Sequence, residues 1–178
     1  MEEILPGVWH WTAVHPKIHM RVSSWYLDGG NVAIDPLLPP EGVDWFESRG
    51  GVSDVLLTNR HHYRDSGALA ERYGATVRCH RAGLHEFKHG EAVEPFEFGD
   101  ELPGGAIACE IDVICDEETA LHLPAVRAVA LQFQTQFAGE MAGIIVQRMV
   151  SGGVEMLVGA IEDPTFGPIG VCGSGGVL

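Results

Sequence analysis

Short apolar segments alternate with turn sequences along the first 80 residues of the chain. Residues 7–13 and 21–27 are rich in valine, tryptophan and tyrosine, a composition typical of half-buried strands. Residues 31–34 form the next predicted strand, and the Asp-Gly-Gly-Asn sequence at 28–31 predicts a hairpin turn before it. The chain therefore begins, on this pattern, with a small antiparallel sheet.

The next part of the pattern combines strands with helices. Prolines and glycines flank a predicted short helix at residues 43–47, and a buried strand follows at 55–58. A helix at 67–73 and a strand at 75–79 complete a second strand–helix unit. Two such units predict an α/β domain with some parallel pairing. From residue 94 to residue 129 the pattern again favours strands.

The composition changes near residue 131. All four tryptophans and all nine histidines precede it, and glycine-rich sequence follows. Three further strand-like runs occupy residues 143–150, 154–161 and 169–172. We therefore expect one domain over residues 1–131 and a second, β-rich segment over residues 132–178.

The charge of the chain limits its partners. Eleven basic and twenty-five acidic residues give a net charge of −14, which argues against nucleic acid and anionic membranes. No apolar run approaches the ~20 residues of a membrane span, and the acidic start is unlike a signal peptide. We therefore expect a cytoplasmic protein. Its four cysteines form no C-x-x-C pair, so we expect reduced thiols and neither a zinc ribbon nor a disulfide framework.

A loop rich in imidazole, guanidinium and carboxylate groups follows the strand at 55–58. It contains Arg60, His61, His62, Arg64 and Asp65. Histidine and aspartate together can hold a divalent metal, and the two arginines could hold an anion. Structural roles are also open, with Asp65 as the N-cap of the next helix and the histidines bonded to backbone carbonyls.

Residues 1–131 resemble the N-terminal half of a metallo-β-lactamase-fold hydrolase. The resemblance rests on the early hairpin, on Ile34-Asp35-Pro36, on the strand that runs into Leu57-Thr58, and on the Ala-Leu-His-Leu-Pro sequence at 120–124. It implies an α/β (α+β) fold that forms half of an αββα sandwich. Members usually carry T-H-x-H-x-D-H after the strand, where this chain has Asn59 at the first histidine.

The resemblance also bears on metal binding. His61 matches the second histidine of the motif, and Asp65 falls near its last position. The region before residue 120 lacks the family's next histidine. The resemblance therefore implies His61 and Asp65 as the metal ligands, zinc as a weakly held metal, and a hydrolase-like protein that is weakly active or inactive.

Residues 143–178 resemble an ATP-grasp fragment of NDP-forming acyl-CoA synthetases of the acetate–CoA ligase type. Four sequence blocks carry the resemblance in order: Ile-Val-Gln-Arg-Met-Val, Gly-Val-Glu-Met-Leu-Val-Gly, Asp-Pro-Thr-Phe-Gly-Pro and Gly-Ser-Gly-Gly. It implies that Gln147 and Met149 lie on the strand that binds adenine and that Glu155 lies near the ribose. Arg148 is the one basic residue after position 131, so we do not expect Mg-ATP to bind well.

Three functional alternatives remain at this point. The chain is a hydrolase-like protein with an incomplete metal site, a fragment of an ADP-forming acyl-CoA synthetase acting with partner chains, or a nonfunctional fusion of the two. Half a sandwich would leave apolar strand residues without a facing sheet, so we expect self-association or a partner chain that supplies the missing half. Part of the following set, which lies on those strands, must face inward: Val22, Trp25, Val32, Ile34, Leu56 and Leu57.

Overall fold

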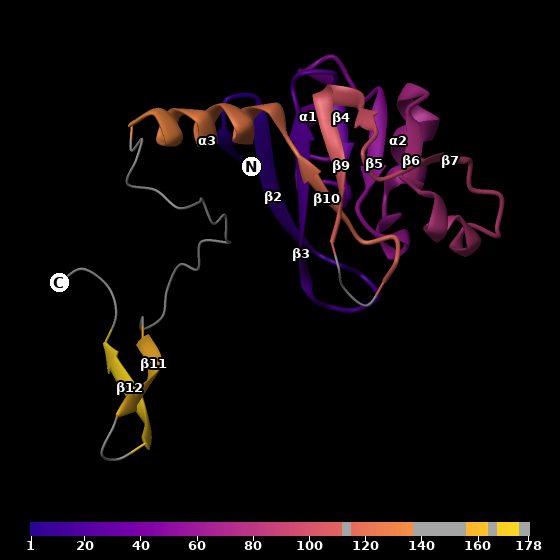
Figure 1. Cartoon of the computed structure of the whole chain (residues 1–178). Helices are drawn as coiled ribbons and strands as arrows, with labels where there is room; N and C mark the ends of the chain where they lie inside the picture. Colours follow the sequence, from indigo (N-terminus) through magenta and orange to yellow (C-terminus); the bar gives the residue numbers. More distant parts are fainter. Residues whose placement is uncertain (112–114, 137–155, 164–166, 175–178) are drawn as a thin grey trace. The chain divides into compact units, whose positions relative to one another are not determined.

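In the computed structural model, the chain divides into two compact units, Met1–Glu140 and Met141–Leu178. The structure describes residues 1–111, 115–136, 156–163 and 167–174. The first unit is a mixed α/β structure, as expected (Figure 1). The boundary expected at residue 131 stays a prediction.

A seven-stranded sheet forms the centre of the first unit, with its strands in chain order. The strands are β1 (Glu2–Leu5), β2 (Val8–Val14), β3 (Arg21–Leu27), β4 (Val32–Ile34), β5 (Asp54–Leu57), β6 (Thr76–His80) and β7 (Val93–Phe96). Strands β1 to β4 pair antiparallel, and β4 to β7 pair parallel. The predicted hairpin is therefore confirmed, together with the parallel pairing that follows it.

Short helices make the crossovers between the parallel strands. Helix α1 (Asp44–Glu47) connects β4 to β5, and α2 (Ser66–Tyr73) connects β5 to β6. Helix α2 ends at Gly74, whose φ of 71° is the left-handed conformation that glycine adopts without strain. Two 3-10 helices, η1 (Arg60–His62) and η2 (Arg81–Glu86), follow β5 and β6 at their carboxyl ends.

The helices cover one face of the large sheet. Side chains of alternate strand positions pack there against Phe46 and Leu69 of the two helices. The hydroxyl of Tyr26 donates to Gly51 O at 2.8 Å, and burial raises the pKa of this phenol to about 12. Leu57 belongs to this cluster, so it does not face the inside of a sandwich.

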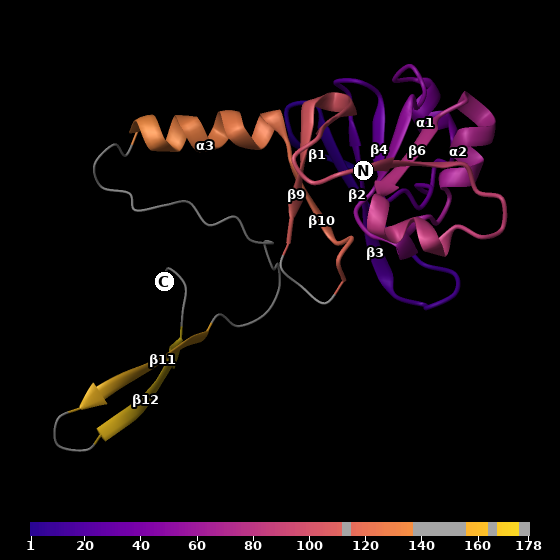
Figure 2. The same cartoon turned by 45° about the vertical axis from the view of Figure 1, so that its right-hand side comes forward.

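A second, three-stranded sheet covers the opposite face of the large sheet (Figure 2). Its strands are β8 (Glu101–Leu102), β9 (Ala106–Glu110) and β10 (Thr119–His122), with a 3-10 helix η3 (Pro103–Gly105) between the first two. The expectation of a bare inner face is wrong for Val32, Ile34 and Leu56. These side chains are 0%, 4% and 0% exposed and pack against Leu102, Ala106 and Ala108.

Several elements differ from the sequence pattern. Strand β1 was not expected, and residues 124–129 lie in helix α3 (Pro124–Gln136) rather than in a strand. Among the residues described, no helix is long and apolar enough to cross a membrane. The second unit contains one antiparallel hairpin, β11 (Met156–Asp163) and β12 (Gly167–Ser174), which overlaps two of the predicted strands. The strand expected at 143–150 lies outside the described residues.

Two glycines allow the sheets to approach closely. A Cβ added to Gly104, in η3, would lie 2.9 Å from Gly29 O and 3.0 Å from a methyl carbon of Leu27. A Cβ added to Gly30 would lie 2.9 Å from Gly104 N. The turn between β3 and β4 therefore touches η3 backbone to backbone, which a side chain on either glycine would prevent.

This contact predicts a difference between two glycine substitutions. Gly99 has a φ of +92° with open space around it, whereas Gly104 has a φ of +77° and no room for a Cβ. We expect Gly99→Ala to destabilise the protein by about 1–2 kcal/mol, from backbone strain alone. Gly104→Ala should cost about 1–3 kcal/mol more, because the two sheets must separate. Urea unfolding of both variants measures the difference, and equal losses would contradict the close contact.

Candidate functional site

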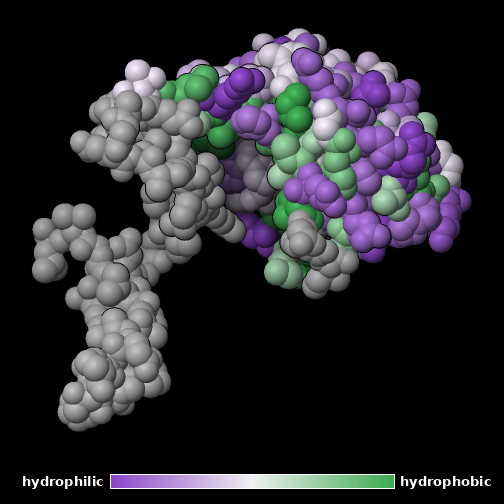
Figure 3. All heavy atoms as spheres, in the orientation of Figure 1, coloured by the Kyte–Doolittle hydropathy of each residue, from purple (hydrophilic) through white to green (hydrophobic). Residues whose placement is uncertain are grey.

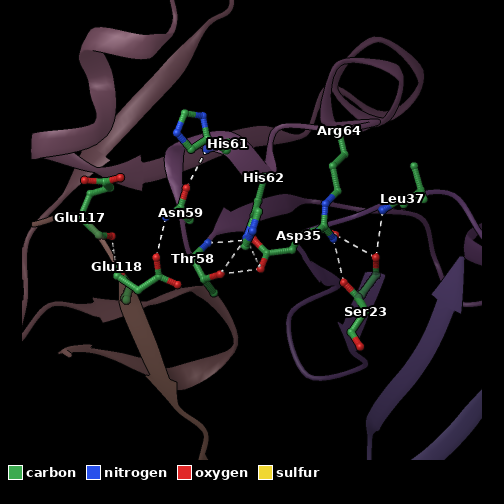
Figure 4. A network of polar contacts seen from close by, with 12 residues as sticks. Ser23, Asp35, Leu37, Thr58, Asn59, His61, His62, Arg64, Glu117 and Glu118 are labelled. Carbon is green, nitrogen blue, oxygen red and sulfur yellow. Dashed lines mark hydrogen bonds and ion pairs between the residues drawn. The ribbon is translucent and has the colours of Figure 1, made fainter. Parts of the chain in front are cut away.

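The candidate site lies at the carboxyl ends of β4 and β5 (Figure 4). Asp35 follows β4 directly, and the loop from Thr58 to Asp65 follows β5. Because β4 and β5 are parallel neighbours, both loops emerge at the same end of the sheet. This is the edge at which open α/β sheets usually bind ligands.

The buried carboxylate of Asp35 connects the two loops. It accepts hydrogen bonds from Thr58 N at 2.8 Å and from Thr58 Oγ1 at 2.5 Å. His62 Nδ1 lies 3.0 Å from Asp35 Oδ2 and 3.2 Å from Thr58 Oγ1. The Asp35 side chain is only 3% exposed, so its charge depends on these three donors in place of water. Figure 4 shows them converging on the carboxylate.

Arg64 holds the same region from the other side. Its guanidinium donates to Ser23 O at 2.7 Å and to Asp35 O at 2.6 Å. Burial lowers the pKa of Arg64, while the nearby Asp35 and Asp65 carboxylates raise it. Arg64 and Asp35 both have positive φ, 42° and 47°, a conformation that residues other than glycine seldom adopt. The hydrogen bond between these two residues therefore joins two strained backbone positions.

Asp65 has a structural partner as well. It stands at the N-cap position of α2, but its side chain makes no cap hydrogen bond. Instead its Oδ2 accepts from Leu38 N at 2.7 Å, and its own N–H donates to Pro36 O at 3.0 Å. Asp65 therefore fixes the loop that leaves β4, which is a different structural role from the cap that the sequence suggested.

Acidic residues just before β10 bind the other end of the loop. Asn59 Nδ2 donates to Glu118 Oε2 at 2.5 Å, and the Asn59 side-chain oxygen accepts from His61 N at 2.9 Å. Arg60 forms an ion pair with Glu117, whose side chain is 3% exposed. Both Arg60 and Arg64 are thus engaged by protein groups, which weighs against the anion site considered from the sequence.

His61 points away from this network, toward a cavity of about 470 Å³. The cavity is lined by His15, Pro16, Lys17, Leu37, Arg60, His61, Tyr63, Arg64, Asp65, Glu86, Phe87, His89 and Glu91. His61 Nδ1 lies 3.9 Å from Glu86 Oε1, and the two side chains are 57% and 46% exposed. This pair is open to solvent and too exposed to form a strong ion pair.

The donor set does not fit a catalytic zinc ion. Zinc in such a site needs three protein ligands from histidine, cysteine or carboxylate side chains. Within the part of the chain that the structure describes, no group of three such residues could hold a metal. The Asn59 amide and the Arg64 guanidinium already bond protein atoms. Cys79, a buried thiol at the end of β6, has its pKa raised to about 12 by burial and is therefore a weak ligand and nucleophile.

The structure brings some of the predicted residues together and adds others. His61 and Asp65 line one cavity, although the Asp65 carboxylate bonds a backbone N–H; their role as metal ligands stays a prediction. Gln147, Met149 and Glu155 lie outside the described residues. Asp35 and Glu117 were not among the site residues expected from the sequence. The position of Asp35 directly after a buried strand was the available signal for it.

The C-terminal part of the chain is similar to known ATP-grasp sequences. A model of the ATP-grasp domain matches residues 119–178. The ADP-forming acetate–CoA ligase I of Archaeoglobus fulgidus is 54% identical to this chain over 35 residues. The match covers 20% of this chain and 5% of the ligase, so the chain spans a small fraction of that relative's length. The resemblance to an acyl-CoA synthetase fragment is confirmed on this segment.

Solved structures match the fold of the chain. A B3 metallo-β-lactamase with an active-site glutamic acid has a TM-score of 0.52 at 19% identity, over 66% of this chain and 54% of that one. TTHA1623, solved in a di-iron-bound form, has a TM-score of 0.52 at 21% identity, over 64% and 67%.

A third neighbour is TTHA1429 of Thermus thermophilus, a metallo-β-lactamase family protein. It has a TM-score of 0.54 at 19% identity, over 68% of this chain and 57% of its own. Identities this low establish a shared fold and not a shared activity. The chain also spans little more than half the length of most of these neighbours. On this evidence the chain shares the metallo-β-lactamase fold over about two thirds of its length, in line with the half sandwich expected for residues 1–131.

Proposed function

We propose that the chain is a hydrolase-like protein of the metallo-β-lactamase fold with an incomplete metal site, weakly active or inactive. The observation that carries this proposal is that side chains of the loop after β5 form hydrogen bonds with other protein groups. Arg64 bonds two backbone carbonyls, and Asn59 bonds Glu118. Asn59, at the position of the motif's first histidine, therefore holds the loop in place together with Arg64.

The remaining groups could still bind a small molecule. The cavity beside His61 contains Lys17 and His89 as well as the carboxylates Glu86 and Glu91. Side chains of both signs favour a polar ligand. Hydrolysis would need an activated water molecule. Two protein ligands are too few to hold a metal ion that could polarise this water.

A second candidate function rests on the C-terminal match. The 54% identity over 35 residues supports descent of this segment from an ADP-forming acyl-CoA synthetase. Turnover of ATP would require cations at the triphosphate, and Arg148 is the one basic residue after position 131. A nonfunctional fusion of the two pieces is the third alternative, and absence of both metal and nucleotide binding would favour it.

The proposal predicts no tight stoichiometric zinc. Protein purified without chelators and analysed for metals should contain well below one zinc per chain, because His61 and Asp65 supply only two ligands. About one zinc per chain, lost in His61→Ala but kept in His85→Ala, would contradict the proposal. His85 is the matched control because it lies nearby on η2 and its ring bonds the Ala82 carbonyl.

The proposal also predicts that Arg64 contributes to the stability of the folded protein. Arg64→Gln removes two part-buried, charge-assisted hydrogen bonds to backbone carbonyls and should lower the free energy of unfolding by about 1.5–3 kcal/mol. Arg81→Gln is the control, because Arg81 is 61% exposed and pairs with Glu97 at the surface. That substitution should change stability by less than about 1 kcal/mol. Equal effects in urea unfolding would show that Arg64 does not hold the loop.

Nucleotide binding should be weak or absent. Calorimetric titration of the full chain with Mg-ATP should give no measurable heat of specific binding, because the segment has too few basic side chains to neutralise the triphosphate. A micromolar dissociation constant that is weakened in Glu155→Gln would contradict this and would favour the acyl-CoA synthetase alternative.

A further inference from the structure

The cavity beside His61 carries opposite charges on segments that are far apart in the sequence. Lys17 comes from the turn between β2 and β3, whereas Glu86 ends η2 and Glu91 follows it. The turn therefore brings a cation to the cavity, and the segment after β6 brings two carboxylates. A cavity of about 470 Å³ has the size of a small-molecule site.

Lys17 and Glu86 are not used by the fold. Among the described residues, the Lys17 ammonium has no ion-pair partner, and only its backbone N–H is bonded, to His15 Nδ1 at 3.2 Å. Glu86 has only the solvent-exposed contact with His61 at 3.9 Å. Both charges are therefore available to a ligand.

Glu91 adds a second carboxylate to the same cavity. Its Oε2 accepts from His89 N at 2.8 Å. Backbone N–H groups, its own first and then that of His89, lower the pKa of the Glu91 carboxyl, so this group is charged at neutral pH. Its other oxygen makes no hydrogen bond to the described residues, so it can accept one from a ligand.

An aromatic pair forms an apolar part of the cavity wall. The rings of Tyr63 and Phe87 lie 5.7 Å apart with 48° between their planes, and both pack against the core on the helix-covered face of the sheet. Leu37, which is 7% exposed, lines the same cavity. An amphipathic ligand can bury an apolar group against these side chains while its charged ends reach Lys17 and Glu86.

The charges disfavour simpler classes of ligand. An anion would meet Glu86 and Glu91 on a chain of net charge −14, and a simple cation would leave the Lys17 ammonium unpaired beside it. A metal ion lacks a group of three ligands over the described residues. Figure 3 shows mostly hydrophilic, purple residues around α2, next to Asp65 of the cavity, which disfavours a purely apolar ligand.

We propose that this cavity binds a short zwitterionic peptide, with its carboxylate at Lys17 and its ammonium at Glu86 and Glu91. A sphere of 470 Å³ is about 10 Å across, and the two charges of a free amino acid lie much closer together than that. A dipeptide, at about 3.5 Å per extended residue, separates its charges by about 7 Å. This inference rests on the proposed function, because it takes the cavity as a binding site that holds no metal ion.

Calorimetric titration with the dipeptide Phe-Ala and its blocked forms tests the proposal. The full chain is first treated with a chelator and dialysed, so that bound metal cannot contribute. We expect Phe-Ala to bind, and N-acetyl-Phe-Ala and Phe-Ala amide, which each lack one charge, to bind about tenfold more weakly. Free phenylalanine should also bind more weakly, because it cannot reach both charged sides. No binding of Phe-Ala at millimolar concentration, or equal binding of any of the other three ligands, would overturn the proposal.

Charge-removing variants assign each end of the peptide. Lys17→Gln should weaken the binding of Phe-Ala about tenfold and leave that of Phe-Ala amide unchanged, because the amide has no carboxylate for Lys17. Glu86→Gln should weaken the binding of Phe-Ala and leave that of N-acetyl-Phe-Ala unchanged. Lys88→Gln and Glu71→Gln are the matched controls, because both residues are exposed and neither lines the cavity. Equal losses in variants and controls, at unchanged melting temperature, would show that the cavity is not the peptide site.

Zinc analysis before the chelator treatment keeps the two proposals separate. A zinc-free chain that does not bind Phe-Ala would contradict the peptide site and leave the incomplete metal site standing. A chain with one zinc that still binds Phe-Ala after the zinc is removed would contradict the incomplete metal site and support the peptide site.

Discussion

The buried carboxylate of Asp35 is the group on which the arrangement of the candidate site depends. A carboxylate with 3% exposure is stable only if protein donors replace water, and here Thr58 and His62 provide them. Thr58 follows β5 and His62 lies in η1, so this single charge connects β4 to the loop that follows β5. Loss of the carboxylate would leave three part-buried donors without this acceptor at once, which costs more than any one of the bonds contributes.

Other side chains of the loop after β5 add further connections at the carboxyl ends of the strands. Arg64 bonds backbone carbonyls of β3 and of Asp35, Asp65 bonds Leu38 N, and Asn59 and Arg60 bond the acidic pair before β10. Each of these side chains cross-links two segments far apart in sequence. The strained φ values of Asp35 and Arg64 persist because the surrounding bonds define both positions. The loop after β5 is therefore built as a structural junction, from which the His61 ring extends toward the cavity.

The sequence predicted local features well and non-local ones poorly. Strand-type composition and the turn sequence at 28–31 correctly predicted β3 and β4, and Gly74 marks the end of α2, because composition, turns and left-handed glycine are local properties. The pairing of Asn59 with Glu118 joins residues 59 positions apart, which no local pattern encodes. The cover provided by β8 to β10 was missed for a related reason. Leu102, Ala106 and Ala108 lie on short strands, and their burial depends on the facing sheet.

The two similarities of this chain meet in β10. The ATP-grasp model begins its match at residue 119, yet β10 pairs with β9 in the first unit and buries Leu121 between the sheets. Thr119 N also donates to Thr58 O, which links this strand to the candidate site. Thus Thr119–His122 serves the fold of the first unit whatever the ancestry of the residues after it. Removing β10 would expose the core between the sheets and free the loop after β5, so the stability of the first unit depends on residues that the second similarity also includes.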